Sequence, residues 1–365
     1  MQCLEKLKLN NTDIEFLNNL KVCKPDENAY KQAKERIDKI AKPLDGLGAF
    51  EESLARISAI KRNTDISIKK RALVIMSSDN GIVDEGVSQS SKEVTLKVVK
   101  NILRTTSSAA VMAKEISADC FVYDVGIDSD ETVAGLIDKK IRCSSRNFLL
   151  EAAMTEKEML DAIQVGINAA YELHEKGYEL IALGEMGIGN TTTSSAICAA
   201  LLNLDAKSVT GRGAGLSDEG LKKKISVIDE SIRKYDLHKK DVLTVLKSVG
   251  GFDIAALTGV CIGGALYGMP VVLDGVITQA AALLACRIQP NVRDYLFASH
   301  KGREIASSLI LSELGLKGVI DADMALGEGT GALMYISLLD MALSVYDNAA
   351  RFDDIEMDKY ERMSR

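Results

Sequence analysis

The amino-acid sequence predicts an α/β fold built on a parallel sheet. From about residue 70 onward, short apolar runs bounded by Gly or Asp alternate with longer segments of helical periodicity. Nearly continuous apolar runs of this length are typical of parallel strands that are covered on both faces. Their alternation with helices indicates right-handed crossover connections between strands. The expected strands are "ALVIMSS", "CFVYDVG", "ELIALG", "PVVLDG" and "GVIDAD".

The two ends of the chain differ from its middle. Residues 1–65 are charged and helical in pattern, and "KPLDGLGAF" interrupts that pattern with a proline and glycines. After residue 345 the tail is again rich in charge. We therefore expect a small helical domain formed by residues 1–65 together with 346–365, and a large α/β catalytic domain at residues 66–345.

One helix can be placed from its end signals. Thr155 and Glu158 have the spacing of a capping box, in which each residue satisfies a backbone N–H of the other. An apolar stripe follows at helical spacing, and Gly177 is expected to end the helix.

Composition excludes several classes of function. The 365-residue chain has a net charge of −7 and no basic block of the length that nucleic acids require. Its N-terminus lacks the basic-then-apolar order of a signal peptide, and its longest apolar runs fall short of a membrane span. The seven cysteines are scattered without a CxxC pair, so we expect no zinc cage. The sequence thus favours a cytoplasmic protein without nucleic-acid or membrane partners, and it calls for no metal or cofactor.

Four of the expected strands end in polar loops. Asp79 and Asn80 follow the first strand, residues 184–190 the third, Asp274 the fourth, and Asp323 with "LGEGTG" the last. The carboxyl ends of parallel strands lie along one edge of the sheet, and ligands bind in the crevice there. A single loop of this kind also serves ordinary turns. Four at equivalent strand ends predict a shared binding site.

The stretch "GEMGIGNTTT" holds the strongest local signal. Gly187 and Gly189 let the backbone approach a ligand, and amides at a helix N-terminus attract an anion such as phosphate. Asn190 and Thr191 can donate to phosphate oxygens or simply cap the helix. Glu185 would repel phosphate but suits the hydroxyls of an adjacent ribose; its alternative is a second helix-capping acid. The spacing matches neither a P-loop nor a dinucleotide fingerprint.

Further candidates are a lysine and another glutamate. Lysines 222–224 lie on a predicted helix whose spacing lets one or two of them face inward. Glu328 lies between two glycines ahead of an apolar helix, where a carboxylate can act as a general base or as an ordinary acid at a helix start. His300, in "FASHKGRE", is a weaker candidate beside the site. These residues indicate an enzyme acting on a phosphorylated sugar with a carboxylate base.

Several ordered motifs resemble one known family. "GEMGIGNTTT", "GRGAGLSDEGLKKKI", "VGGFDIAALTG", "VLDGVITQAAALLA" and "MALGEGTGA" follow one another as in nicotinate-nucleotide–dimethylbenzimidazole phosphoribosyltransferases, and "SSDNGIVDEGVSQSSKEVT" resembles an upstream segment of that family. The resemblance covers roughly residues 40–345. It implies a Rossmann-like large domain, a small domain made from both chain ends, and dimers in which the partner's N-terminal region completes each active site.

The resemblance also implies a reaction and residue roles. The phosphoribosyl group of nicotinate mononucleotide would move to an aromatic base without a cofactor, and the protein would be a homodimer. Glu328 would be the general base, Glu185 would face the ribose, and Lys224 would bind the phosphate. The other expected substrate-binding residues are Gly187, Gly189, Asn190, Thr191, Asp274, Thr278 (where a serine is common), Asp79, Asn80 and Lys92.

The chain departs from the family pattern at two places. Leu44, Asp45 and Gly46 replace the second proline, the glycine and the serine of that pattern, and Ser91 with Lys92 stands where Pro-Gln is usual in the segment that lines the family's base pocket. A lysine there favours an oxygen or a phenolate, unless it points to water. Alternatives therefore stay open: a relative that uses phenol or p-cresol, one chain of a heterodimer, or a non-catalytic nucleotide-binding partner.

Overall fold

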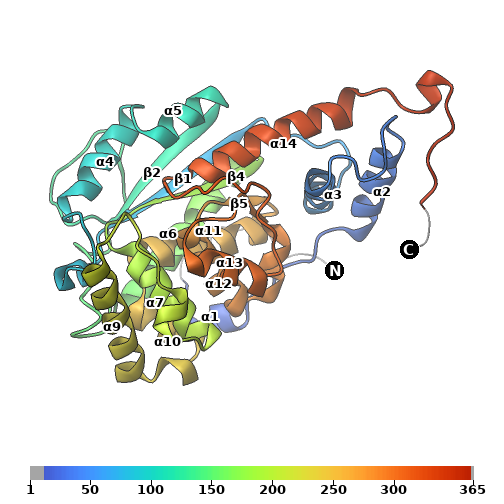
Figure 1. Cartoon of the computed structure of the whole chain (residues 1–365). Coiled ribbons are helices and arrows are strands. Elements are labelled where there is room, and N and C mark those ends of the chain that lie inside the picture. The colour runs from blue at the N-terminus through green and yellow to red at the C-terminus, as the bar shows by residue number, and fades with distance from the viewer. Residues whose placement is uncertain (1–11, 363–365) are drawn as a thin grey trace.

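A six-stranded parallel sheet forms the centre of the structure, a computed structural model that describes residues 12–362 (Figure 1). The strand order is β3-β2-β1-β4-β5-β6, so the chain runs outward from β1 and then returns to fill the other side. This is the order of Rossmann-like sheets, and it places the change of direction between β1 and β4. The strands are β1 Arg71–Ser78, β2 Ala118–Gly126, β3 Ile137–Asp138, β4 Leu180–Met186, β5 Val271–Leu273 and β6 Leu296–Ala298.

The two central strands explain why the sequence reads as uninterrupted apolar runs. All eight residues of β1 are buried, and β1 pairs in parallel with both β2 and β4. Strand β4 continues through Met186, so Gly184 and Glu185 belong to the strand and not to the loop after it. Glu185 is therefore held by the sheet itself.

Helices cover both faces of the sheet (Figure 1). On one face lie α4 (Glu93–Leu103), α5 (Ser108–Glu115) and α14 (Thr330–Asn348). On the other lie α11 (Phe252–Tyr267) and α12 (Val276–Ile288). The predicted α/β fold class is confirmed.

The expected helix after Thr155 is confirmed as α6, Glu156–Glu175, and it packs on the outside of α11. Its capping box is formed, and Gly177 follows its end with φ 76°. Glycines allow α6 and α11 to approach closely: a Cβ on Gly166 would lie 1.8 Å from the carbonyl oxygen of Ala256. This contact fixes how the two helices cross.

Most of the remaining helices pack on other helices. Within residues 12–362, none of the helices has the length and hydropathy to cross a membrane. These helices are α1 Ile14–Asn18, α2 Glu27–Asp38, α3 Ala49–Lys61, α7 Asn190–Leu202, α8 Ala206–Val209, α9 Asp218–Tyr235, α10 Val242–Val249 and α13 Ile305–Glu313, with short 3-10 turns at Gly81–Glu85, Leu237–Lys239, Pro290–Tyr295 and Asp353–Ile355.

Residues 38–45 lie beside the C-terminal segment 351–362, near the end of α14 (Figure 1). Ile40 forms an antiparallel bridge with Arg351, and Arg362 binds Asp38 and Asp45 at 2.9 Å each. Helices α2 and α3 pack together there.

The segment before α2 runs elsewhere. Thr12 bonds to Gln164 of α6, and Tyr295 donates to the carbonyl of Cys23, so residues 12–23 lie on the α/β part of the molecule. Residues 1–11 and 363–365 of the expected small domain lie outside the described residues. The division into two domains stays a prediction.

One expected strand is wrong. "GVIDAD", residues 318–323, forms no strand; Ile320 makes a single bridge with His300. Val319 and Ile320 are half-buried and residues 321–323 are exposed, so this apolar run lacks the two-sided cover that a parallel strand requires. The outer strand is instead β6, three residues that the apolar pattern was too short to reveal.

Candidate active site

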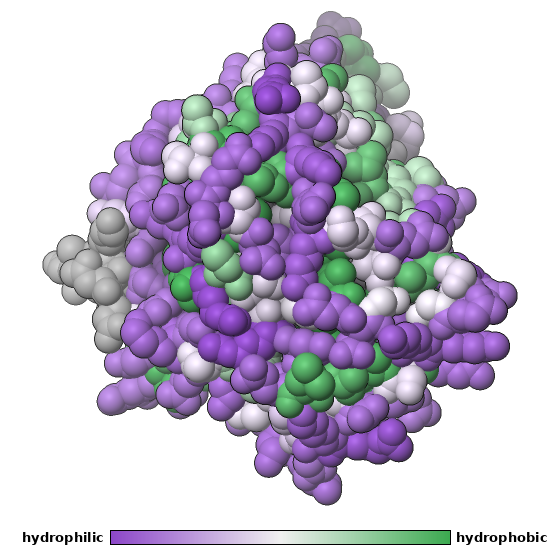
Figure 2. All heavy atoms as spheres, turned by 90° about the vertical axis from the view of Figure 1, so that its left-hand side faces the viewer, coloured by the Kyte–Doolittle hydropathy of each residue, from purple (hydrophilic) through white to green (hydrophobic). Residues whose placement is uncertain are grey.

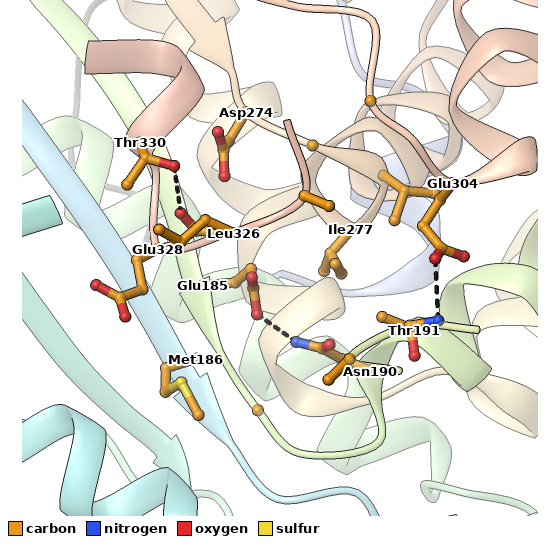
Figure 3. Close-up of a pocket in the computed structure, with 18 of the residues that line it drawn as sticks. Glu185, Met186, Asn190, Thr191, Asp274, Ile277, Glu304, Leu326, Glu328 and Thr330 are labelled. Carbon is orange, nitrogen blue, oxygen red and sulfur yellow. Dashed lines mark hydrogen bonds between the residues drawn. The ribbon is translucent and has the colours of Figure 1, made fainter. Parts of the chain in front are cut away.

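A cavity of about 320 Å³ opens at the carboxyl ends of β4 and β5, beside the change of direction between β1 and β4 (Figure 3). Its wall also includes residues of α4 and the segments 300–304 and 324–330. The face of the molecule that carries α4 and α9 is mainly hydrophilic, with small apolar patches between polar side chains (Figure 2). The predicted residues that line the cavity are Glu185, Gly187, Asn190, Thr191, Asp274, Thr278 and Glu328.

Glu185 and Asp253 form a buried pair of carboxylates bridged by one amide. The Nδ2 atom of Asn190 donates to Oε2 of Glu185 (Figure 3) and, at 3.1 Å, to Oδ2 of Asp253. Burial raises the pKa of Glu185 to about 8 and the pKa of Asp253 to about 6. A cation that enters the cavity would favour the ionised form of Glu185, and the ionised carboxylate would stabilise that cation.

The start of α7 has a charge distribution that suits an anion. Gly189 precedes the helix with φ 97°, and no side chain caps it. Helix capping, the alternative role of Asn190 and Thr191, is not formed: Asn190 donates to the two carboxylates, and the Thr191 hydroxyl accepts a hydrogen bond from Lys224 Nζ at 2.9 Å. The N–H groups of Asn190 and Thr192 bond to the carbonyls of Gly187 and Gly189, so it is the positive end of the α7 dipole that attracts negative charge here.

Lys224 is the inward-facing lysine of α9. Its side chain is fully buried, and burial lowers its pKa to about 8 although the Glu304 carboxylate opposes this shift. Lys224 does not line the cavity itself but reaches it through the Thr191 hydroxyl. A phosphate beside Thr191 would favour the charged form of the lysine.

Glu328 lies in a turn of unusual backbone. Gly327, Glu328 and Gly329 all have left-handed φ angles, of 93°, 59° and 95°. Such a run is costly for a residue with a Cβ, and it occurs where the surrounding structure imposes it. The Glu328 carboxylate accepts a hydrogen bond from the N–H of Ala109, at the start of α5, over 3.3 Å. It points away from Glu185, toward the α4–α5 side of the cavity (Figure 3).

Asp274 is buried at the end of β5, and its carboxylate faces the backbone. Its Oδ2 accepts from the N–H of Gly329 at 3.1 Å and its Oδ1 from the N–H of Gly331 at 2.7 Å. Burial raises the pKa of Asp274, while the nearby His300 ring and these N–H groups oppose the rise. Thr278, one helical turn further, donates to the carbonyl of Gly275 at 2.9 Å.

Besides Lys224, four predicted residues do not line the cavity. Asp79 accepts from the Thr95 hydroxyl at 2.6 Å, and Asn80 and Gly189 pack against each other. Lys92 pairs with Asp84 at 3.0 Å and with the more distant Asp128, so its ammonium is held outside the cavity. For Asp79, Asn80 and Gly189 this geometry indicates a supporting role behind the cavity wall.

The sequence left some site residues unassigned. Arg303 and Glu304 line the cavity after β6, and His300, only a weak candidate from the sequence, does so too. Glu304 accepts from the N–H of Gly213 at 2.9 Å, whereas no described residue forms a hydrogen bond or ion pair with the Arg303 guanidinium. Asp253 stands in the quoted motif "VGGFDIAALTG", where a single acid at the start of a wholly apolar helix was the available signal.

The fold and the cavity together define a Rossmann-like α/β protein with a carboxylate-lined cavity at the edge of its sheet. A family model described as phosphoribosyltransferase matches residues 22–356. A Clostridium perfringens protein named nicotinate-nucleotide–dimethylbenzimidazole phosphoribosyltransferase is 41% identical over 333 residues, which cover 91% of this chain and 92% of the relative. The protein of that name from Acetivibrio thermocellus is 40% identical over 326 residues, 89% and 93% of the two chains.

Solved structures of similar proteins point to the same family. The crystal structure of CobT from Thermus thermophilus matches with a TM-score of 0.86 at 36% identity, covering 91% of this chain and 100% of that one. The chain belongs to the phosphoribosyltransferase family that these relatives represent. The resemblance seen in the motifs is confirmed.

Proposed function

We propose that the protein transfers the phosphoribosyl group of nicotinate mononucleotide to 5,6-dimethylbenzimidazole or a similar base. The products are an α-riboside 5′-phosphate and nicotinate, for assembly of the cobamide nucleotide loop. The observation that carries the proposal is the presence, in one cavity, of a helix start suited to phosphate, a buried carboxylate at Glu185 and a second carboxylate at Glu328. The activity in the names of the relatives supports the same reaction.

The nucleotide half of the reaction uses the α7 side of the cavity. The 5′-phosphate binds at the positive end of α7, next to Thr191 and, behind it, Lys224. Glu185 then lies beside the ribose. When the bond from C1′ to the pyridinium nitrogen breaks, its electron pair stays on neutral nicotinate nitrogen and positive charge develops on the ribose. The ionised Glu185 carboxylate stabilises that charge.

In the second half of the reaction, the acceptor base binds on the α4 side of the cavity. A ring nitrogen of the base attacks C1′ from the face opposite nicotinate, which inverts the configuration from β to α. The N–H proton of the azole passes to the Glu328 carboxylate, which the base reaches in place of the Ala109 N–H. Binding both partners in line supplies much of the acceleration.

The cavity wall favours an azole over a phenol as the acceptor. On the α4 side it consists of Ser90, Val94 and Val98, and Met186 and Leu326 add further apolar surface. Lys92, which could have stabilised a phenolate, is paired with Asp84 instead. An uncharged aromatic base with an N–H group suits such a wall.

An acceptor screen tests this function. The purified chain is incubated with nicotinate mononucleotide and either 5,6-dimethylbenzimidazole, adenine, phenol or p-cresol, and nicotinate release is measured by chromatography. We expect release with the azoles. Turnover with phenols alone, or only after a homologous chain is added, would instead assign the phenol-type reaction. Nucleotide binding without any turnover would assign a non-catalytic partner.

The assembly that we propose is a homodimer. Val111 of α5 with Met334 and Met341 of α14 exposes apolar side chains on two helices that pack against each other. Burial of these side chains against a second copy would remove apolar surface from water. Light scattering tests this: we expect twice the monomer mass, and a monomer at all concentrations would contradict it.

A cytoplasmic location stays a prediction.

A further inference from the structure

Asp274 has an arrangement that differs from that of a substrate ligand. Its side chain is buried, and both carboxylate oxygens accept backbone N–H groups of the segment that starts α14. The distances are 3.1 Å to Gly329 and 2.7 Å to Gly331. Asp274 comes from the end of β5, so these two bonds tie the sheet to the turn that contains Glu328.

That turn needs an external tie. Glu328 has a left-handed φ of 59° between two glycines that also have left-handed φ angles, a backbone that a residue with a Cβ seldom adopts. Behind it, β4 packs closely: a Cβ on Gly184 would lie 2.5 Å from the carbonyl oxygen of Glu328. The turn is thus pressed against β4 on one side and hydrogen-bonded to Asp274 on the other.

His300 supports the carboxylate of Asp274 from behind. Its Nδ1 lies 2.9 Å from the Ser299 hydroxyl and 4.0 Å from Oδ1 of Asp274. A Cβ on Gly331 would lie 2.1 Å from the same Nδ1 atom, so only glycine fits between the ring and the helix start. The His300 ring therefore fills the space beside Oδ1 of Asp274 and the first turn of α14.

We propose that Asp274 is a positioning residue: it holds the left-handed turn 327–329 so that the Glu328 carboxylate faces the acceptor. This role rests on the proposed function, because Glu328 is its general base. It replaces the substrate-binding role that the sequence suggested for Asp274. In this arrangement the substrate contacts the Glu328 side chain of the turn, and Asp274 binds the backbone of the turn.

The Asp274→Asn variant tests the proposal. An amide has the same shape but puts an N–H₂ group where one oxygen accepted an N–H, so one bond to Gly329 or Gly331 is lost. A misplaced catalytic group costs about 10²-fold in rate. We expect kcat to fall by about that factor while the KM for nicotinate mononucleotide is unchanged. A raised KM with unchanged kcat would overturn the proposal, because it would mark a direct substrate contact.

A double variant sharpens the test. If Asp274 acts through Glu328, adding Asp274→Asn to Glu328→Gln lowers the residual rate little further. Independent, multiplying losses would contradict the proposal. Asp321→Asn is the matched control, since this exposed carboxylate lies in the same loop and, within residues 12–362, forms an ion pair with Lys301 alone, at 3.7 Å; we expect wild-type kinetics from it.

Hydrogen exchange of the wild-type protein tests the tie without any variant. We expect the amides of Gly329 and Gly331 to be protected well beyond those of the exposed residues 321–323. Equal exchange in both groups would overturn the proposal even if the variant fails to fold. If the wild-type protein transfers to no acceptor, the proposed function fails, and the exchange measurement still decides whether Asp274 holds the turn.

Discussion

Lys224 donates a hydrogen bond to the hydroxyl of Thr191 over 2.9 Å, which joins α9 to the first turn of α7. The ammonium is fully buried, and its pKa is lowered to about 8 because burial disfavours the charged form. A phosphate dianion bound at α7 would favour the charged form again. The lysine therefore couples phosphate binding to the uptake of a proton above pH 8.

This coupling predicts how phosphate affinity changes with pH. Below pH 8 Lys224 is already charged, and binding is flat once the phosphate is doubly ionised. Above pH 8 the free protein must first protonate the lysine, so the Kd rises by up to about tenfold per pH unit. Calorimetry with ribose 5-phosphate measures this without interference from the pyridinium charge. Lys224→Arg, which stays charged, should flatten the curve, and a flat curve for the wild type would contradict the assignment.

The raised pKa of Glu185 predicts how the reaction rate changes with pH below about 8. Its pKa in the free protein is about 8, so it is largely protonated at neutral pH, and kcat/KM for nicotinate mononucleotide should rise with pH up to about that value. The cationic substrate lowers this pKa, so the same limb in kcat should lie at lower pH. Glu185→Gln should remove the limb and slow turnover by about 10²–10³-fold. A limb that persists in Glu185→Gln would assign it to another group.

We predict that Arg303 binds an anionic group of the nucleotide. It lines the cavity, and no described residue pairs with its guanidinium. Loss of a charged hydrogen bond costs about 1.5–3 kcal/mol, so Arg303→Ala should raise the KM for nicotinate mononucleotide by about ten- to a hundredfold. Two analogues identify the group: nicotinamide mononucleotide lacks the carboxylate, and nicotinate riboside lacks the phosphate. If Arg303→Ala leaves the KM of one analogue unchanged, the group missing from that analogue is the one that Arg303 binds. Lys301→Ala, outside the cavity, is the control; equal kinetics of the two variants would refute the contact.

The parts of the fold that the sequence predicted are those where one residue pattern permits one structure. The continuous apolar run in β1 requires cover on both faces, and the pair Thr155–Glu158 defines a helix start by itself. The run at 318–323 has the same local pattern but lacks cover, and cover depends on which distant elements pack there. Sequence pattern alone does not contain that information.

The candidate site divides in the same way. Gly187, Asn190 and Glu185 lie in one short stretch, so their joint position at the strand end could be predicted. The partner of Asn190 on its other side, Asp253, is 63 positions away in the sequence, and only the fold brings the two together. Lys92 shows the converse, because nearby carboxylates bind it and hold it away from the cavity.

The rate of acceptor-dependent nicotinate release by Glu328→Gln tests the central claim most directly. The glutamine keeps the shape of the side chain but cannot take the azole proton. We expect unchanged calorimetric affinity for nicotinate mononucleotide, an unchanged melting temperature, and single-turnover release with 5,6-dimethylbenzimidazole slowed by about 10²–10⁴-fold. Release at the wild-type rate would show that Glu328 is not the base and would contradict the account.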